Sequence, residues 1–458
     1  MIGLVDADLL DGGTRHPNLV LLKLAGFLHD NNIEFELIEN SDIDIERYEK
    51  IYISKVFTFT EEPKFVKKYK DTQHWNKFSF GGTGYYATIE NDKDFIIRRR
   101  NDMFQLENDL FLNTLPNIRG GKKMGLDMAH QMPYYDLYNK YIENKVREGK
   151  KISYFKDYLK YSIGFLTRGC FRKCPFCVNR LEKIIKPYSE ISWFLNDERD
   201  EKGKLKRPYI YLWDDNFLAA SPSIWRPLLR ELMQTGRPFQ FRQGLDERII
   251  AESPYGVEIA ETLSKCKYHG DYIFAFDNWN DRKKIVKALK IWRHYNKKET
   301  KFYLFCGFKQ SVNDLKKFQL DIAEIFLRIC ILMRFGCLPY IMRHEDYKKA
   351  PIPNLYVQIA RWCNQPGFYR NLSFWQFCYK NQTYWEEHTL GIKHDRIKTY
   401  EEFIEDKDNG YYNDKKICSP LKSIHEFIQL YESHKCLFLD LFNLSFKQMI
   451  DEALWETW

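Results

Sequence analysis

Three cysteines stand close together in the sequence, at Cys170, Cys174 and Cys177, within the stretch "TRGCFRKCPFC". Three residues separate the first pair and two separate the second pair. Cysteine thiolates at such short spacing are soft ligands, suited to zinc or to an iron-sulfur cluster. We therefore take this stretch as the candidate metal centre of the protein.

The number of cysteines bears on which metal group they would hold. A structural zinc site closes its tetrahedron with four ligands, and neither a second cysteine pair nor a histidine follows within about twenty residues. A 4Fe-4S cluster held by three thiolates leaves one iron without a protein ligand, and that iron can bind a small molecule. The spacing favours the cluster, while a zinc knuckle and three buried thiols stay as alternatives.

Strand and helix patterns alternate from residue 156 onward. Apolar and β-branched runs near residues 163, 210, 240, 273, 303 and 340 predict six strands, each followed by a helical pattern. Six βα units are fewer than the eight of a closed barrel, so we expect an open, partial (β/α)6 parallel barrel over residues 156–348. The cysteines directly follow its first strand, at the end of the strands where parallel barrels keep their chemistry.

Three further regions surround this expected barrel. Residues 1–90 read as strand, helix and further strands, which predicts a Rossmann-like α/β domain with a small parallel sheet. Residues 91–155 lose periodicity and gain charge, which predicts an irregular linker on the surface. Beyond residue 349 the strand pattern ends and aromatic-rich helical segments follow, so residues 349–458 are expected to form a helical C-terminal cap.

The cysteine spacing, its place after the first strand of a partial barrel, and an aromatic residue before the last cysteine together resemble the radical S-adenosylmethionine (radical SAM) enzymes. The resemblance implies that Cys170, Cys174 and Cys177 hold a 4Fe-4S cluster whose free iron binds S-adenosylmethionine. One electron then cleaves S-adenosylmethionine and yields a 5'-deoxyadenosyl radical. By the same resemblance, Phe176 is expected to lie beside the adenine of S-adenosylmethionine.

The resemblance also implies that other strand ends contact S-adenosylmethionine. In place of the family's Gly-Gly-Glu-like segment, this chain has "LWDDNF", in which Asp214, Asp215 or Asn216 can accept a hydrogen bond from the methionine amino group. The further candidates for carboxylate and ribose contacts are Arg242, Gln243, Asp277 and Arg343. An alternative interpretation is that Asp215 and Asp277 simply cap the helices that follow them.

A Rossmann-like domain ahead of a "TRGC" barrel resembles the class of radical SAM enzymes that carries a cobalamin-binding domain. Ser54, Val56 and Thr58 in "SKVFT" and the Gly81-Gly82 turn fall where such domains have a strand end and a glycine pair. The histidine that ligates cobalt is absent from "DADLLDGG" after the first strand. Bound cobalamin and a domain that only supports the barrel therefore both stay open.

Composition describes an ordinary globular protein of 458 residues, 44% hydrophobic and 29% charged, with room for two or three domains. No run approaches the roughly 18 to 20 apolar residues of a membrane span, and the start "MIGLVDAD" is unlike a leader. The 11 cysteines lack the spacing of a disulfide framework, which favours a reducing compartment. We expect a cytoplasmic protein without a membrane partner.

The net charge of +8 does not by itself indicate a nucleic-acid partner. Cations gather around the cysteines, where they would offset the negative charge of a cluster and attract an acidic electron donor such as a flavodoxin or ferredoxin. They are Arg168, Arg172, Lys173 and Arg180, and they fit a solvated face equally well.

We therefore expect a radical SAM enzyme that acts on an unidentified substrate. One alternative is a radical SAM methyltransferase, or a methylthiotransferase-like modifier, of RNA or protein. An alternative of another class is a non-catalytic nucleic-acid-binding protein in which zinc staples the cysteine loop.

Overall fold

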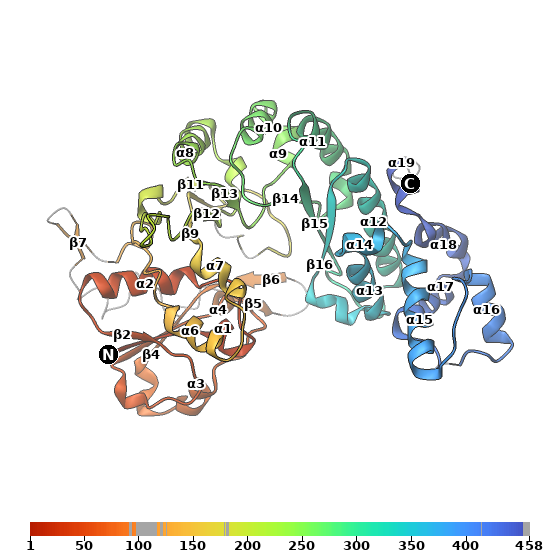
Figure 1. Ribbon diagram of the computed structural model, residues 1–458, viewed down its shortest axis with the longest axis horizontal. Helices are drawn as coiled ribbons and strands as arrows, with labels where there is room; N and C mark the ends of the chain where they lie inside the picture. The colour runs from red at the N-terminus through yellow and green to blue at the C-terminus, as the bar shows by residue number, and fades with distance from the viewer. Residues whose placement is uncertain are drawn as a thin grey trace. The chain divides into compact units, whose positions relative to one another are not determined.

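The structure is a computed structural model (Figure 1) that describes residues 1–90, 94–97, 117–119, 122–124, 126–177, 179, 183–413 and 415–451. The chain forms two compact units. The first comprises residues 1–243 and 266–269, and the second comprises residues 244–265 and 270–458. The division falls inside the expected barrel, and the domain boundaries expected at residues 90, 155 and 348 stay predictions.

The N-terminal residues form the expected parallel α/β sheet. Its strands, in the order β2-β1-β3-β4, are β1 (Ile2–Asp6), β2 (Phe35–Leu37), β3 (Lys50–Ser54) and β4 (Phe78–Gly81). The apolar run of β1 is buried throughout, as is usual for a parallel strand with both faces covered. Helix α2 (Leu19–Asp30) begins after Asn18, whose side chain accepts a hydrogen bond from the Leu21 amide.

Shorter elements complete the N-terminal part of the chain. They are the helices α1 (Ala7–Asp11), α3 (Lys64–Tyr69) and α4 (Thr83–Tyr86), and the antiparallel pairs β5 (Ala87–Glu90) with β6 (Asp94–Ile97) and β7 (Asn117–Arg119) with β8 (Lys122–Met124). Strands β6 to β8 fall within the expected linker, of which residues 98–116 lie outside the described part.

The described end of the expected linker is not irregular. It contains the helices α6 (Asn139–Arg147) and α7 (Lys156–Leu159). Apolar side chains from residues 126 to 158 are buried in one core together with α2, β1, β9 (Tyr161–Gly164) and β12 (Tyr209–Leu212). The sequence pattern was misleading because the buried residues here, three of them tyrosines, are spread irregularly among polar neighbours and do not form a helical apolar stripe.

Buried hydrogen bonds fix this segment to the strands that follow. The Tyr135 hydroxyl donates to the Phe194 carbonyl at 2.6 Å and accepts from the Ile163 amide at 2.9 Å. Arg207 is only 5% exposed, and its guanidinium donates to the carbonyls of Tyr135, Tyr158 and Tyr161. The segment thereby joins the N-terminal sheet to β9 within the first unit.

Six parallel strands follow, three in each unit. In the first unit β9, β12 and β13 (Phe239–Phe241) pair in the order β13-β12-β9. In the second unit β14 (Tyr272–Ala275), β15 (Thr300–Cys306) and β16 (Leu338–Arg343) pair in the order β14-β15-β16. All six predicted strands are present and parallel, while their closure into a single partial barrel stays a prediction.

Helices follow five of these strands, as expected from the βα rhythm. They are α8 (Pro222–Gln234), α9 (Arg248–Glu252), α10 (Gly256–Ser264), α11 (Arg282–Tyr295) and α12 (Leu315–Arg334), with the cap helix α13 (Pro353–Cys363) after β16. Between β9 and β12 the described residues carry only short elements, including a 3-10 turn over Ile191–Trp193, so the helix predicted there is wrong for the described part.

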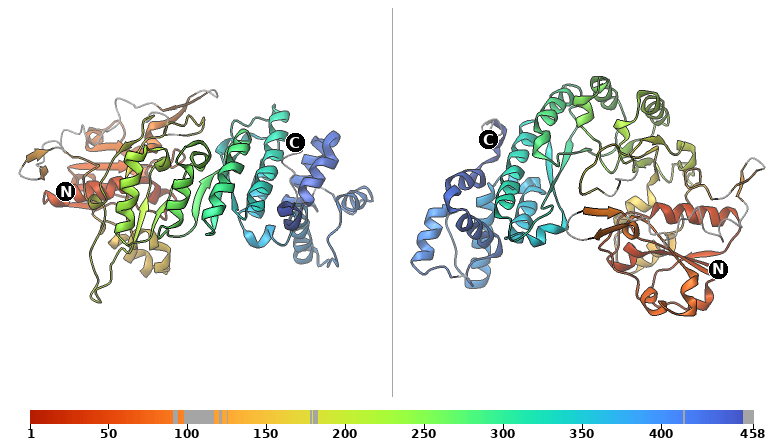
Figure 2. Two further views of the ribbon diagram at one scale, coloured as in Figure 1. Left: turned by 90° about the horizontal axis from the view of Figure 1, so that it is seen from above. Right: turned by 180° about the vertical axis from the view of Figure 1, so that it is seen from behind.

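The last part of the second unit is helical, as predicted. Beyond α13 it contains α14 (Pro366–Tyr369), α15 (Phe374–Leu390), α16 (Tyr400–Asp408), α17 (Ser419–Leu430), α18 (Lys435–Asn443) and α19 (Phe446–Asp451) (Figure 2). Trp362 and Trp375 are buried in its core. Across the described residues, no helix combines the length and the apolar composition that a membrane span needs.

A buried polar network lies between β1 and β3, where the strand order of the N-terminal sheet changes direction. The Tyr138 hydroxyl donates to Asp6 Oδ2 at 2.8 Å and accepts from the Asn18 amide at 3.0 Å. Asn18 Nδ2 donates to Ser54 Oγ at 2.8 Å. Burial raises the pKa of Asp6 to about 7, although the Tyr138 hydrogen bond lowers it.

Asp6 should make stability depend on pH. Because the pKa of Asp6 is higher in the folded than in the unfolded protein, its contribution is full below about pH 4 and is lost as pH rises to about 7. The contribution is on the order of 4 kcal/mol. We expect the unfolding free energy of Asp6→Asn, measured by urea denaturation, to decrease less between about pH 4 and pH 7 than that of the wild-type protein. An unchanged slope, equal to that of the exposed control Asp42→Asn, would contradict this.

Candidate metal centre after strand β9

The cysteine loop leaves the sheet at the carboxyl end of β9 and returns through a short neck. In this neck β10 (Thr167–Arg168) pairs antiparallel with β11 (Lys186–Pro187), and the Tyr188 amide donates to the Leu166 carbonyl at 2.8 Å. The three cysteines lie between the two sides of the neck, partly exposed and without disulfide bonds. The loop therefore has fixed ends.

Asp214 holds the chain just before the loop. It follows β12, is 1% exposed, and accepts hydrogen bonds from the Thr167 amide at 2.6 Å, the Thr167 hydroxyl at 2.7 Å and the Leu166 amide at 3.1 Å. Burial raises its pKa to about 7, although these hydrogen bonds lower it. Both oxygens contact the protein itself, so the structure gives Asp214 a positioning role.

Asp215 and Asn216 hold the loop itself. Asp215 Oδ2 accepts from the Gly169 amide at 2.8 Å, and its Oδ1 accepts from Asn179 Nδ2 at 2.7 Å. Its carboxylate also pairs with Arg168 Nε at 3.3 Å. Asn216 Nδ2 donates to Cys170 Sγ at 3.4 Å. Gly169 has a φ of +105°, in the left-handed region that favours glycine, and so turns the chain into the loop.

Three thiols at this spacing are a donor set of the kind that an iron-sulfur cluster takes. The pKa of the Cys177 thiol is raised to about 11, mainly by burial and to a lesser extent by Cys174 and Cys170, although the Asn179 amide lowers it. Amide donors reach two of the sulfurs, because the Asn179 amide lies 3.4 Å from Cys177 Sγ and Asn216 contacts Cys170 Sγ; such hydrogen bonds tune cluster potentials. Among the described side chains no three His, Cys, Asp or Glu groups are placed to share a single metal ion.

Neither aspartate named as a possible helix cap acts as one. The 3-10 turn over Phe217–Ala219 starts after Asn216, whose side chain makes no capping hydrogen bond. The turn over Trp279–Asp281 starts after Asn278, which accepts from the Asn280 amide at 2.9 Å. The capping interpretation of Asp215 and Asp277 is therefore wrong.

The structure gives fewer contacts for the other residues that are predicted to bind S-adenosylmethionine. Phe176 is half-buried and Gln243 is exposed. Arg242 lies over the Tyr211 ring and pairs with Asp157 at 3.7 Å, within the first unit. Whether any of these side chains contacts S-adenosylmethionine stays a prediction.

Two predicted residues belong to the second unit. Burial raises the pKa of Asp277 to about 6, although Arg328 and Arg248 lower it. Arg343 is exposed and lies over the Tyr347 ring at 4.7 Å. Their place beside the cysteine loop stays a prediction.

Part of the cationic cluster predicted around the cysteines is already engaged. Arg168 pairs with Asp215, and its guanidinium lies 4.3 Å from the Phe165 ring centroid. Arg172 lies over Phe171 at 4.6 Å, and Lys173 is exposed. Arg180 lies outside the described residues.

The features compared with a cobalamin domain serve the N-terminal sheet itself. Gly82 has a φ of +94°, and a Cβ there would lie 2.3 Å from the Lys55 carbonyl oxygen, so its backbone packs against the chain. Ser54 Oγ accepts from Asn18 Nδ2, Val56 is 43% exposed and Thr58 is exposed. Whether this domain binds cobalamin stays a prediction, and we derive no chemistry through it.

Sequence reasoning missed three residues of the site: Thr167, Gly169 and Asn179. Each contacts Asp214 or Asp215, so their role depends on pairing between β9 and β12. The sequence carried only an indirect signal, because the predicted strands β9 and β12 end shortly before the segments that make these contacts.

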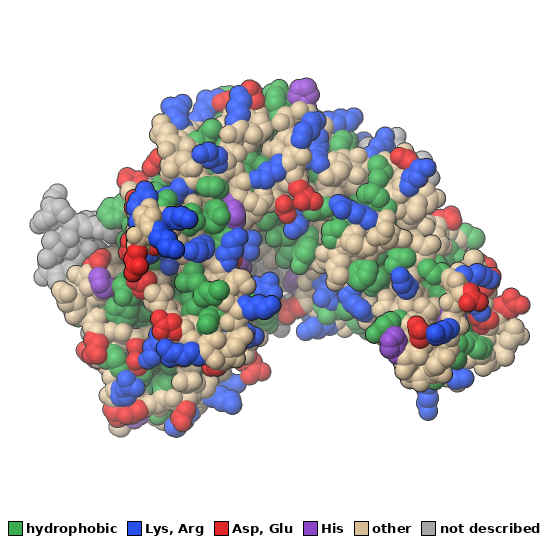
Figure 3. Space-filling model, viewed as in Figure 1, with side chains coloured by type: hydrophobic (Ala, Val, Ile, Leu, Met, Phe, Trp, Pro, Cys, Tyr) green, Lys and Arg blue, Asp and Glu red, His purple; other side chains and the backbone are tan. Residues whose placement is uncertain are grey.

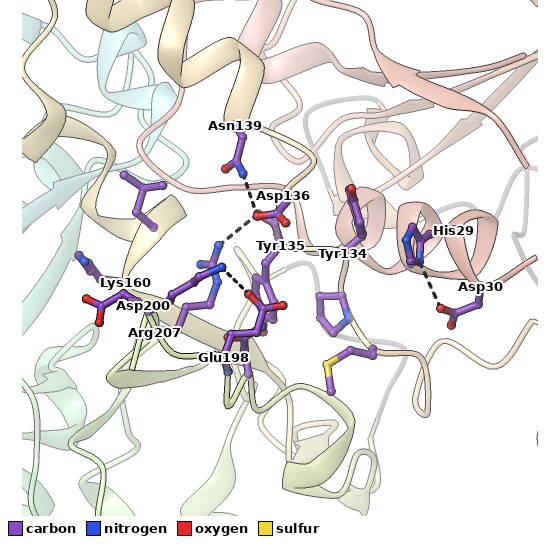
Figure 4. Close-up of a pocket in the computed structure, with 16 residues that line it drawn as sticks. His29, Asp30, Tyr134, Tyr135, Asp136, Asn139, Lys160, Glu198, Asp200 and Arg207 are labelled. Carbon is purple, nitrogen blue, oxygen red and sulfur yellow. Dashed lines mark hydrogen bonds and ion pairs between the residues drawn. The ribbon is translucent and has the colours of Figure 1, made fainter. Parts of the chain in front are cut away.

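Figure 4 shows a pocket of the first unit. It has a volume of about 690 Å³, and its lining includes His29, Asp136, Lys160, Glu198 and Arg207. Lys160 and Arg207 precede β9 and β12, whereas the cysteines follow β9. The pocket is therefore not part of the candidate metal centre.

Comparisons with known proteins give one distant likeness. No protein-family model and no curated protein matches this chain. Two solved structures of the radical S-adenosylmethionine methyltransferase TsrM from Kitasatospora setae are 12% and 11% identical, with TM-scores of 0.42 and 0.43. Both cover 78% of this chain, and 75% and 76% of the TsrM chains. One contains cobalamin and a [4Fe-4S] cluster, and the other contains tryptophan and the analogue aza-SAM. The likeness is too distant to support an activity.

Removing the Asp215 carboxylate should loosen the cysteine loop. Asp215→Ala removes the partners of Gly169, Asn179 and Arg168, so we expect faster tryptic cleavage after Arg172 and Lys173 in protein without metal. Mass spectrometry of the fragments measures this rate. Glu201→Ala, an exposed acidic residue elsewhere in the first unit, is the control. Equal cleavage in both variants would show that Asp215 does not hold the loop.

Proposed function

We propose that this protein is a radical SAM enzyme that holds a 4Fe-4S cluster through Cys170, Cys174 and Cys177. The observation that carries the proposal is a three-cysteine loop at the carboxyl end of a parallel strand, braced by consecutive polar residues of the neighbouring strand. When bound, such a cluster supplies the electron that cleaves S-adenosylmethionine to a 5'-deoxyadenosyl radical.

The chain's own residues prepare this site in two ways. Asp214 and Asp215 fix the backbone that leads into the loop, so that the thiols start from a defined position. Asn216 and the Asn179 amide donate to cysteine sulfurs and stabilise their thiolate forms. Because the pKa of the Cys177 thiol is raised, loading with metal must release its proton.

The remaining contacts belong to the proposal as well. Phe176 is assigned to the adenine, and Arg242 and Gln243 to polar groups of S-adenosylmethionine, whereas Asp215 holds the loop. Asp277 and Arg343 belong to the second unit, and their contact with S-adenosylmethionine stays a prediction. The exposed cation Lys173 suits docking of an acidic electron donor, such as a flavodoxin or ferredoxin. The described contacts favour neither methyl transfer to RNA or protein nor bound cobalamin.

Loss of one cysteine should abolish the cluster. We expect wild-type protein, reconstituted without oxygen, to hold about four irons per chain, and Cys174→Ala to lose most of this iron and all 5'-deoxyadenosine formation. Iron analysis and chromatography measure the two effects. Cys436→Ala, an exposed cysteine in the second unit, is the matched control and should keep both.

A spectroscopic measurement tests the proposal directly. Electron paramagnetic resonance of dithionite-reduced protein should show a cluster signal that shifts when S-adenosylmethionine is added, as an open iron site requires. A signal that does not change when S-adenosylmethionine is added would overturn the proposal. A colourless protein with stoichiometric zinc would also overturn it and would favour a loop that zinc stabilises.

A further inference from the structure

One face of the β13-β12-β9 sheet is lined with tyrosines. Tyr161 of β9 pairs in register with Tyr209 of β12, and Tyr211 lies two residues further along, so all three side chains share a face. The Tyr161 and Tyr211 rings stack with centroids 3.6 Å apart, and the Tyr161 hydroxyl lies 3.1 Å from His269 Nε2. Two cations lie over this face, Lys156 over Tyr161 and Tyr209, and Arg242 over Tyr211.

These two cations line a pocket of about 590 Å³ in the first unit. Its charged lining residues are Arg15, Lys150, Lys151, Lys156, Asp157 and Arg242. They come from three separate segments: the connection between α1 and α2, the stretch from α6 to α7, and the residue after β13. The fold thus brings five cations and one carboxylate to a single cavity.

The one carboxylate in the pocket is already engaged. Asp157 is 15% exposed, and it lies 2.5 Å from His16 Nδ1 and 3.7 Å from Arg242 Nη2. The other four cations form no ion pair with a carboxylate of the described residues. Arg15 and Lys150 instead lie over the Tyr154 ring, at 5.5 and 5.6 Å from its centroid.

The pocket thus gathers charge of mainly one sign. On the face seen in Figure 3, basic and acidic side chains are largely interspersed. Like charges gathered in a cavity repel one another, and the field lines they focus there attract anions. Arginine and lysine together suit phosphate best, since arginine binds its oxygens in pairs and lysine binds it as a point charge.

We propose that this pocket binds phosphate groups, so that its ligand is a phosphate-bearing molecule with at least two negative charges. The proposal goes beyond the proposed function and does not depend on it. The shared chemistry admits two sources, a small phosphate ester and the backbone of a single-stranded nucleic acid.

Direct binding of two probes tests the proposal. Inorganic pyrophosphate and a short single-stranded RNA are titrated into the full-length protein at two salt concentrations, by calorimetry and fluorescence anisotropy. We expect at least one probe to bind, and the double variant Lys150→Ala, Lys151→Ala to weaken that binding at least about tenfold. Arg15→Ala, on another wall, should weaken it as well. Lys202→Ala, Lys204→Ala is the matched control, since both lysines are exposed in the first unit and line neither pocket.

The outcomes separate the two sources and the two proposals. Pocket-dependent binding of pyrophosphate supports a small phosphate ester, while stronger RNA binding that falls steeply with salt supports a nucleic acid. Binding of neither probe, or an equal loss in the control, overturns the inference. Formation of 5'-deoxyadenosine without any substrate tests the proposed function separately, so that one proposal can fail while the other stands.

Discussion

A loop that carries three thiols makes few backbone hydrogen bonds of its own, and its polar groups need partners from elsewhere in the protein. Here Asp214, Asp215 and Asn216 supply those partners from the end of β12. They reach the loop because the carboxyl ends of neighbouring parallel strands lie at one edge of a sheet. A shift of one residue in the pairing of β12 with β9 would turn these side chains to the opposite face. The geometry of the candidate metal centre therefore depends on the register of two short strands.

The same register is supported from the amino ends of the strands. Arg207 precedes β12 and donates to the carbonyls of Tyr158 and of Tyr161 at the start of β9, while the Tyr135 hydroxyl accepts from the Ile163 amide. These contacts are buried in the core that includes α2 and β1, so the N-terminal sheet is packed as one body with the strands of the first unit. The N-terminal domain therefore stabilises the strands β9 and β12, from which the cysteine loop is held.

The sequence predicted the features that are local and missed those that depend on pairing. Alternating apolar runs located all six strands, because buried parallel strands are apolar along their whole length. The cysteine loop could also be predicted, because the spacing of its cysteines is a property of the local sequence. Asp214 was one of three residues predicted to accept from the methionine amino group, and only the fold reveals that its oxygens accept from Leu166 and Thr167. The tyrosine-rich stretch from residue 126 was read as a surface linker because buried tyrosines do not show as an apolar stripe.

The neck formed by β10 and β11 has a thermodynamic consequence. Bringing the ends of a flexible loop together costs conformational entropy, which grows with the logarithm of loop length. In this protein the pairing of Thr167 with Pro187 fixes the ends of the loop when the chain folds, so metal binding would not have to supply this entropic cost. The thiols then search a small volume instead of the volume open to a free chain, so their effective concentration for one another is high. Changes in loop length between the two sides of the neck would leave the strands of the sheet unaltered.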